Sequence, residues 1–473
     1  MAGFGKQFLK TLLSFFKILL SRLGLPPESN MISNSHANHS TLQKHYSLIH
    51  NSKRSFSNQT ILVFDLEAAL LKSSSLFPYF MLVAFEAGGL IRALILLLSY
   101  PFLCSVGKEL GLKIMTFISF VGIRKSKFRA GTAVLPKFFL EDVGCEGFDL
   151  VMCCARKIGV SKLPRIMVEG FLKDYIGVEA VLARDMKEVY SVTEAERRNW
   201  RFLPRERYPK PLIFHDGRLS FRPSAFATIA MFMWLPFGFL LSIFRITVGL
   251  LLPFEMSSSI LAFTGTISVI SKPSQPFNSA MSRGSLYVCN HKTLLDPVYT
   301  SLTIMKPVTA VTYSVSRFNE VISPIKTVRL TRDRDRDRKL MDKILSQGDL
   351  VVCPEGTTCR EPYLLRFSPL FAEIADEIVP VAIDVQISMF YGSTASGLKC
   401  LDPVFHYMNP RPIYFVKVLE KLPGSRTCMI GGKSTFEVAN YVQNEIAKTL
   451  GFECTSLTRK DKYMILAGNN GII

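Results

Sequence analysis

The chain has 473 residues, of which 48% are hydrophobic and 20% charged, so it is neither a mostly disordered protein nor a small disulfide-stapled scaffold. Lysine and arginine total 57 against 38 acidic residues, and the resulting formal net charge of +19 favours an anionic partner. A mean hydropathy of +0.24 favours a membrane over nucleic acid, for which the sequence carries no recognition motif.

Residues 1–27 carry lysine or serine every three or four positions, opposite a face of phenylalanine and leucine. This pattern predicts an amphipathic basic helix, and two interpretations stay open: a helix lying in the membrane interface, or a mitochondrial transit peptide. Residues 28–60 are rich in serine, asparagine and histidine without regular spacing, which predicts a polar linker rather than a metal site. The ten cysteines show no paired spacing, which predicts reduced thiols.

Residues 61–222 alternate between strand-like and helix-like patterns, which predicts an α/β domain. The apolar run ILVFDL predicts a buried strand that ends at Asp65. Residues 77–105 are apolar but interrupted by glycine and charge, so they predict a buried helix pair or a re-entrant segment. The arginine-rich residues 197–222 are expected on the cytosolic side of a membrane.

Residues 223–272 are predicted to be a membrane-embedded hydrophobic segment. Twenty uncharged positions, 225–244, match the length of one bilayer crossing before Arg245 interrupts the run. Two arrangements fit: a straight helix with a second, shorter limb, or a shallow hairpin that enters and leaves on one face. Just before this segment, the sequence His215-Asp216-Gly217 is predicted to be a turn.

Residues 273–455 return to an α/β pattern, with buried strands predicted at 285–290, 349–353 and 378–384. The alternating arginines and aspartates of 332–338 predict a solvated helix face. Residues 456–473 are predicted to be a short, polar and mobile tail.

The first of these strands leads to His291, and Asp296 follows five residues later. A carboxylate beside a histidine ring fixes its tautomer and stabilises the imidazolium, so the other ring nitrogen can take a proton from an alcohol. No serine nucleophile is needed if that alcohol belongs to the substrate. The structural alternative is that Asp296 merely caps a helix before Pro297, but its spacing from His291 favours catalysis.

The second strand leads to the sequence CPEGTTCREP, called here the PEGT loop (residues 353–362). Gly356 permits a tight turn, and the backbone amides around 356–358 could form an anion-binding nest. Arg360 adds a guanidinium that can grip a phosphate with two hydrogen bonds. An ordinary strand-to-helix turn is the structural alternative.

These motifs resemble those of the glycerolipid acyltransferase superfamily, in which a His-x-x-x-x-Asp motif precedes PEGT-x-x-R. The stretches around Arg317 and Arg329 look like the intervening motif, and Ile378-Val379-Pro380-Val381-Ala382 looks like the fourth, apolar motif. Over roughly residues 60–450 the chain is similar to the land-plant glycerol-3-phosphate acyltransferases.

The resemblance implies an α/β fold with an N-terminal domain like the haloacid-dehalogenase phosphatases, a C-terminal acyltransferase domain, and a hydrophobic membrane segment joining them. It implies acyl transfer from acyl-CoA to sn-glycerol 3-phosphate, giving lysophosphatidic acid for glycerolipid synthesis, including the cutin and suberin type. His291 would be the general base and Asp296 its orienting partner. The substrate-binding residues would be Arg317, Arg329, Glu355, Gly356, Thr357 and Arg360.

No metal or other cofactor is implied. The expected location is a membrane, the endoplasmic reticulum first and the mitochondrion as the alternative. Acyl chain length, oxidation state and the acylated position stay open, as do the donor's identity and the number of membrane crossings.

The phosphatase motifs of the N-terminal domain are degenerate. Asp65-Leu66-Glu67 stands where the related phosphatases carry Asp-x-Asp, Ser161 could supply the second-motif hydroxyl, and the later acidic motif is missing. An inactive phosphatase domain is therefore expected. The alternatives are a bifunctional enzyme that releases monoacylglycerol and a non-catalytic membrane scaffold.

Overall fold

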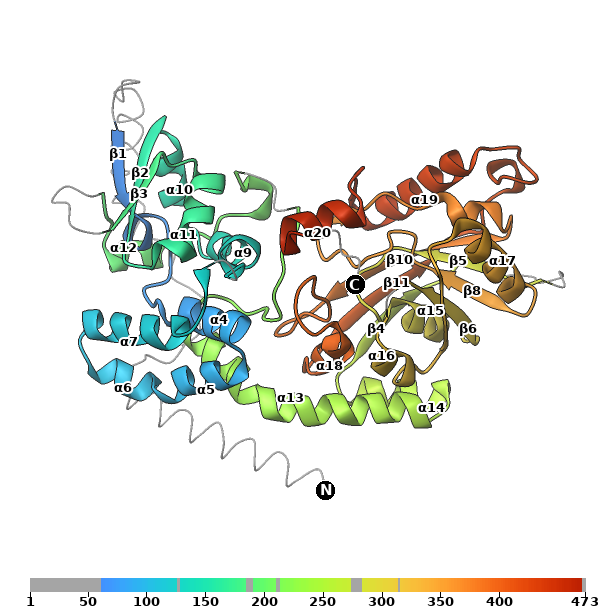
Figure 1. Ribbon diagram of the computed structural model, residues 1–473, viewed down its shortest axis with the longest axis horizontal. Helices are drawn as coiled ribbons and strands as arrows, with labels where there is room; N and C mark the ends of the chain where they lie inside the picture. The colour runs from blue at the N-terminus through green and yellow to red at the C-terminus, as the bar shows by residue number, and fades with distance from the viewer. Residues whose placement is uncertain are drawn as a thin grey trace, which may run out of the picture. The chain divides into compact units, whose positions relative to one another are not determined.

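The structure is a computed structural model that describes residues 61–125, 128–183, 190–209, 213–273, 283–313 and 315–469 (Figure 1). The predicted basic helix and polar linker lie outside the described residues.

The N-terminal part contains a three-stranded parallel sheet, in which β1 (Ile61–Asp65) pairs with β2 (Arg156–Ser161) and β2 with β3 (Ala180–Ala183). The predicted strand therefore ends at Asp65, as expected. The helices of this part are α3 (Leu66–Ala69), α4 (Phe77–Gly88), α5 (Leu90–Leu98), α6 (Tyr100–Ser105), α7 (Lys108–Phe120), α8 (Ala130–Ala133), α9 (Leu135–Leu140), α10 (Cys145–Met152), α11 (Arg165–Phe171) and α12 (Glu194–Arg198).

The apolar residues 77–105 form one buried helix and two helices whose apolar side chains are exposed to solvent. The first eight residues of α4 are all buried. Helices α5 and α6 instead expose Ile91, Leu98 and Phe102 at 77%, 72% and 56%. The prediction of a buried helix pair is therefore wrong for the second helix, because only two of its residues face the core.

The long apolar helix α13 (Ala225–Leu251) is followed by the shorter α14 (Phe254–Phe263). By length and composition alone, α13 could cross a membrane. This matches the prediction of a straight helix with a second limb, but Arg245 does not interrupt the helix. Its side chain is fully buried and donates to the carbonyl oxygens of Tyr407 and Asn409 at 2.8 and 2.7 Å, so its charged head is satisfied inside the protein.

The C-terminal part is built on a seven-stranded sheet of order β4-β11-β10-β5-β8-β6-β7. All neighbours are parallel except β10 and β11. The strands are β4 (Ile267–Ser271), β5 (Leu286–Cys289), β6 (Val308–Thr312), β7 (Lys326–Arg329), β8 (Asp349–Val352), β10 (Ile378–Gln386) and β11 (Ile413–Val418), while β9 (Tyr363–Leu364) and β12 (Glu453–Cys454) form a separate pair. The sheet thus begins inside the segment that the sequence assigned to the membrane.

Helices cover both faces of this sheet, as the alternation along β5 shows. Leu286 and Val288 enter the core formed with α17 (Arg334–Leu345) and α19 (Thr435–Leu450). Tyr287 and Cys289 enter the opposite core, formed with α15 (Asp296–Ile304). The remaining helices are α16 (Arg317–Val321), α18 (Asp402–Tyr407) and α20 (Arg459–Ala467).

The polar tail contains a packed helix. Helix α20 buries Tyr463, Leu466 and Ala467 and begins with a capping box between Thr458 and Asp461. The prediction of a mobile tail is therefore wrong for residues 459–467, because these apolar side chains recur with helical spacing and find a core. In α17 the prediction of a solvated face holds apart from Asp337, which is buried and accepts from the Thr331 N–H at 2.7 Å.

Candidate active site

The two predicted motif loops meet because the strands that lead to them, β5 and β8, are parallel neighbours. The carboxyl ends of such strands lie at the same edge of a sheet. Asn290 fixes the first loop to β10, where its side-chain amide exchanges two hydrogen bonds of 2.8 Å with the backbone of Ile383. His291 follows directly, and the sequence prediction that a strand delivers it to a loop is met.

His291 and Asp296 form the predicted pair. The Nδ1 atom of His291 lies 3.0 Å from Oδ2 of Asp296, whose side chain is fully buried. The same oxygen accepts the N–H groups of Lys292 and Thr293 at 2.6 and 2.9 Å, so the carboxylate is held rigidly. This leaves Nε2 of His291 as the ring nitrogen for a substrate proton.

Glu355 connects the PEGT loop to the histidine loop. Its carboxylate accepts the His291 N–H at 2.7 Å and the Leu365 N–H at 3.0 Å, while the Cys359 N–H donates to the His291 carbonyl at 2.6 Å. Burial raises the pKa of Glu355 to about 7. Glu355 thus positions the backbone of the histidine loop. Gly356 has a φ of +67°, which explains why a glycine occupies the turn.

A cavity of about 440 Å³ opens beside His291. Gly356 and Thr357 of the PEGT loop line it, and so do Ile246 and Gly249 of the apolar helix α13. Much of its wall is apolar and comes from Leu294, Val298, Val311, Ile325, Leu330 and Phe371. The arrangement places the His291 ring at the wall of a chamber that extends to the apolar helix α13.

The three arginines that the sequence predicted as substrate-binding residues do not line this cavity. Arg317 is exposed on α16, and Arg329 is paired with Glu320 and donates to the Val315 carbonyl at 3.1 Å. Arg360 is buried, lies over the Tyr391 ring at 4.1 Å and approaches Asp216 at 3.9 Å. Their role in substrate binding stays a prediction, and their placement gives it no support.

Other basic side chains, which the sequence did not single out, line the cavity instead. They are Arg366 after β9, Lys399 before α18 and Arg459 at the start of α20. No motif marks them, because they are separated by 33 and 60 positions in the chain. The only available signal was the basic composition of the tail.

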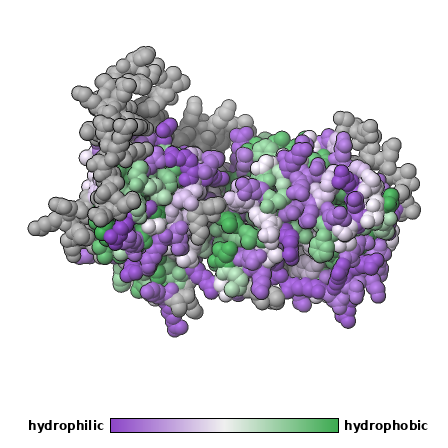
Figure 2. Space-filling model, turned by 90° about the horizontal axis from the view of Figure 1, so that it is seen from above, coloured by the Kyte–Doolittle hydropathy of each residue, from purple (hydrophilic) through white to green (hydrophobic). Residues whose placement is uncertain are grey.

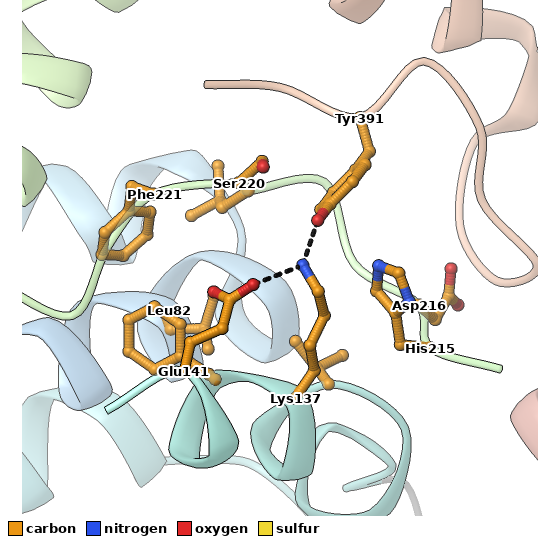
Figure 3. A pocket seen from close by; sticks show the side chains of 11 residues that line it. Leu82, Lys137, Glu141, His215, Asp216, Ser220, Phe221 and Tyr391 are labelled. Atoms are coloured by element: carbon orange, nitrogen blue, oxygen red, sulfur yellow. Dashed lines mark hydrogen bonds and ion pairs between the residues drawn. The ribbon is translucent and has the colours of Figure 1, made fainter. Parts of the chain in front are cut away.

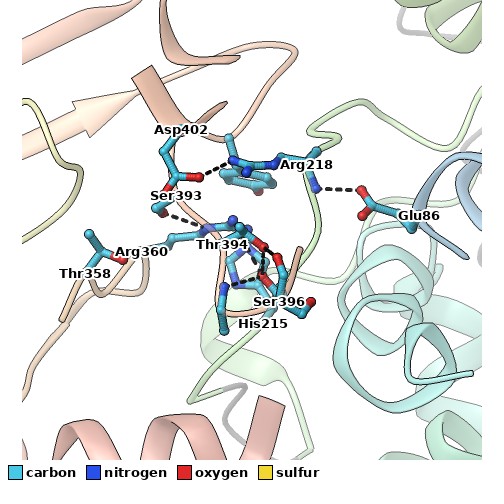
Figure 4. Close-up of polar contacts among 12 residues, drawn as sticks. Glu86, His215, Arg218, Thr358, Arg360, Ser393, Thr394, Ser396 and Asp402 are labelled. Carbon is cyan, nitrogen blue, oxygen red and sulfur yellow. Dashed lines mark hydrogen bonds and ion pairs between the residues drawn. The ribbon is translucent and has the colours of Figure 1, made fainter. Parts of the chain in front are cut away.

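The segment His215-Asp216-Gly217, predicted to be a turn, is buried against the PEGT loop (Figure 4). The His215 N–H donates to Glu361 at 2.8 Å, and its ring Nδ1 contacts the same carboxylate oxygen. Burial opposes ionisation of Glu361, but His215, Lys462 and Arg360 lower its pKa to about 2. Gly217 has a positive φ of +98°, so the predicted turn is present, and the same segment also binds Glu361 of the PEGT loop.

Asp216 and Glu86 extend this network across the fold. Asp216 accepts from the Thr394 hydroxyl at 2.8 Å and from the backbone N–H of Ser396 at 3.0 Å. Glu86 of α4 accepts the N–H groups of Arg218 and Leu219 at 2.5 and 3.2 Å. The network therefore ties the N-terminal part to the loops around the cavity.

Figure 3 shows a second connection, where Lys137 of α9 lies between Glu141, at 3.1 Å, and the Tyr391 hydroxyl. The hollow beside these residues has a volume of only about 10 Å³. This hollow is too small for a substrate, so the contacts around Lys137 have a structural function.

The degenerate phosphatase residues bond to one another. Asp65 caps α3 by accepting the Ala68 N–H at 2.9 Å. Glu67 accepts the Ser161 hydroxyl at 2.5 Å and the Lys162 N–H at 2.8 Å, and burial raises its pKa to about 7. Among the described residues, no group of three histidine, cysteine, aspartate or glutamate side chains is placed to hold a metal ion.

Comparison with known proteins decides the family. Residues 61–194 match the HAD-like domain of RAM2-like glycerol-3-phosphate acyltransferases, and residues 271–385 match the acyltransferase family. The Arabidopsis thaliana protein named probable glycerol-3-phosphate acyltransferase 2 is 49% identical, covering 88% of this chain and 90% of its own length. Glycerol-3-phosphate acyltransferase RAM2 of Petunia hybrida is 40% identical, covering 86% and 97%.

The chain belongs to the plant glycerol-3-phosphate acyltransferase family. The resemblance noted in the sequence is thereby confirmed, as are the HAD-like and acyltransferase domains and the enzymatic nature of the protein. A solved structure, the 1-acyl-sn-glycerophosphate acyltransferase PlsC of Thermotoga maritima, superimposes with a TM-score of 0.30 at 15% identity, over 47% of this chain and 97% of that one. In this acyltransferase, the family motifs and the long apolar helix come together around one cavity.

Proposed function

We propose that this acyltransferase moves an acyl group from acyl-CoA to a hydroxyl of sn-glycerol 3-phosphate, giving lysophosphatidic acid for glycerolipid synthesis. The observation that carries the proposal is the His291–Asp296 pair at the wall of a cavity that reaches α13. The substrate hydroxyl attacks the thioester carbonyl carbon, so a C–O bond forms and the C–S bond breaks. Its proton passes to Nε2 of His291 and then to the departing thiolate, which leaves as CoA.

The placement of α13 supports a path for the acyl chain. Ile246 and Gly249 contribute to the cavity wall, whereas Phe237, Leu240 and Leu251 on the same helix are 59%, 66% and 75% exposed. One face of the helix thus borders the reaction chamber while apolar side chains of another face outward. We propose that the acyl chain lies along this helix, with its tail in the lipid phase.

We further propose that the protein lies on one membrane leaflet without crossing it. Helix α13 is attached along its length: Trp234 donates to the Met408 carbonyl at 2.8 Å, and Arg245 is enclosed by carbonyl groups. The exposed apolar helices α5 and α6 lie along the same lower edge of Figure 1 as α13. On the opposite side, hydrophilic residues predominate over the acyltransferase part (Figure 2).

Incubation of membranes with labelled glycerol 3-phosphate and acyl-CoA tests the reaction. The expected product is lysophosphatidic acid, made by the wild-type chain and not by His291→Ala. Monoacylglycerol would support the bifunctional alternative, and no product from either chain would support the scaffold. The endoplasmic reticulum is the proposed organelle, checked by imaging the full chain with a tag.

Topology needs a separate experiment. Protease sites inserted after Arg205 and after Lys421, both exposed, are expected to be cleaved from the same, cytosolic side of sealed vesicles. Cleavage from opposite sides would contradict attachment to one leaflet.

A further inference from the structure

Arg245 of α13 lines the cavity but is bound by backbone carbonyl groups, and three further basic side chains line the cavity wall from other segments. Arg366, Lys399 and Arg459 all line the chamber that His291 lines. Two acidic residues among the described lining residues are engaged elsewhere: Glu355 accepts two backbone N–H groups, and Asp402 pairs with Arg218. This wall therefore presents positive charge to whatever enters.

The C-terminal helix α20 holds the three segments together. Lys399 donates to the Tyr463 hydroxyl at 2.9 Å, and Thr357 of the PEGT loop bonds to the same tyrosine. The Arg366 N–H donates to the Leu457 carbonyl at 2.9 Å, just before the helix. Lys462, on the same helix, donates to the Thr358 carbonyl. The Lys399 side chain, the backbone of Arg366 and the start of α20, where Arg459 lies, are thus all tied to one support.

The local electrostatics fit an anion. Burial would raise the pKa of Tyr463, but the hydrogen bond from Lys399 and the charges of Lys462 and Lys399 lower it. Burial and the charge of Arg332 lower the pKa of Arg459. The lowered pKa of Tyr463 and the effect of Arg332 on Arg459 indicate a positive field, which a phosphate would relieve.

We propose that Arg366, Lys399 and Arg459 form a subsite for a phosphate monoester, and that helix α20 holds this subsite at the cavity wall. The inference rests on the proposed function, which brings two such groups to the enzyme: the phosphate of glycerol 3-phosphate and the 3′-phosphate of CoA. It replaces Arg317, Arg329 and Arg360 with residues that line the chamber. A phosphate held here keeps the rest of its molecule in the same chamber as His291.

The experiment compares Arg459→Ala and Lys399→Ala with Lys460→Ala, a matched control that removes an exposed charge from the same helix outside the cavity lining. A lost hydrogen bond to a charged group corresponds to about a 10-fold or greater change. We expect KM to rise by that factor for one substrate in the first two variants, and to stay within about two-fold in the control. Arg459→Lys is expected to recover part of the loss.

The substrates identify which phosphate binds. A rise in KM for glycerol 3-phosphate assigns the subsite to the acceptor. A rise for acyl-CoA, with no change for the acyl thioester of dephospho-CoA, assigns it to the donor. Unchanged KM values for both substrates would overturn the proposal.

A readout independent of activity separates this inference from the proposed function. Inorganic phosphate is expected to raise the thermal unfolding temperature of the wild-type chain and of Lys460→Ala, but not of Arg459→Ala. This result would stand even if the wild-type chain made no acylated product. Equal stabilisation of all three chains would refute the subsite.

Discussion

The substitution Asp296→Asn separates the proposed catalytic function of the Asp296 charge from the structural function of this side chain. Oδ2 of Asp296 accepts two backbone N–H groups and faces Nδ1 of His291, whereas Oδ1 accepts the Thr293 hydroxyl at 3.1 Å. An asparagine can place its oxygen at the first position and its amide nitrogen at the second, where the rotatable Thr293 hydroxyl can accept. The fold should therefore survive while the negative charge is lost.

For Asp296→Asn we expect a lower kcat and little change in stability. Without the carboxylate charge, the imidazolium formed during proton transfer loses its stabilising partner, so kcat should fall by about 10²–10³. Asp296→Ala removes the acceptor of two buried N–H groups as well, at about 1–3 kcal/mol each, and should also destabilise the protein by about 2–6 kcal/mol.

The assay is initial-rate acyl transfer with purified chains, together with thermal unfolding. Asp335→Asn, an exposed position on α17, is the matched control and should match the wild type in both. Asp296→Asn with a rate within about three-fold of wild type would refute the proposed role of the pair. An unfolding temperature as low as that of Asp296→Ala would refute the proposed amide orientation.

Three further predictions follow from buried groups. Arg245→Met leaves several backbone carbonyl groups without a donor, so it should lower the free energy of unfolding by at least about 3 kcal/mol. Denaturant titration in detergent measures this change, and Arg222→Met, at an exposed position, is the control. The pKa of Glu355 is about 7 in the folded chain and 4.5 in its unperturbed state, so the folded chain binds more protons between these two pH values. This group should therefore lower the free energy of unfolding by about 3 kcal/mol as the pH rises from about 4.5 to 7. Unfolding of Glu355→Gln, measured at several pH values, should lack that decrease. Purified protein with Mg²⁺ should release no inorganic phosphate from lysophosphatidate, and release that disappears in Asp65→Asn would show a working phosphatase site.

The sequence predicted the elements whose position follows from local pattern. The strands before His291 and before the PEGT loop are short apolar runs with turn residues after them, and parallel pairing then forces the two loops together. The pairing of His291 with Asp296 also follows, because five positions span the turn into α15. These parts of the site depend on contacts that are near in sequence or imposed by the sheet.

The placement of the arginines could not be predicted in the same way. Arg360 follows a glycine turn, yet its side chain points to Tyr391 and Asp216, because 215–218 and 391–396 provide acceptors there. Arg459 looked like part of a polar tail, and only the docking of Tyr463 and Leu466 brings it to the cavity. Side-chain direction and tertiary docking depend on partners distant in sequence, which periodicity does not encode.

The enclosure of Arg245 has a consequence for the biogenesis of this protein. Its acceptor Pro410 lies 165 residues further along the chain, so at about 5–20 residues per second the ribosome needs roughly 8–33 s to supply it. During that interval the guanidinium on this apolar segment has Thr264 as an acceptor but lacks the carbonyl groups of Tyr407, Asn409 and Pro410. We expect α13 to be a binding site for chaperones during translation, and its release to await synthesis of the acyltransferase sheet.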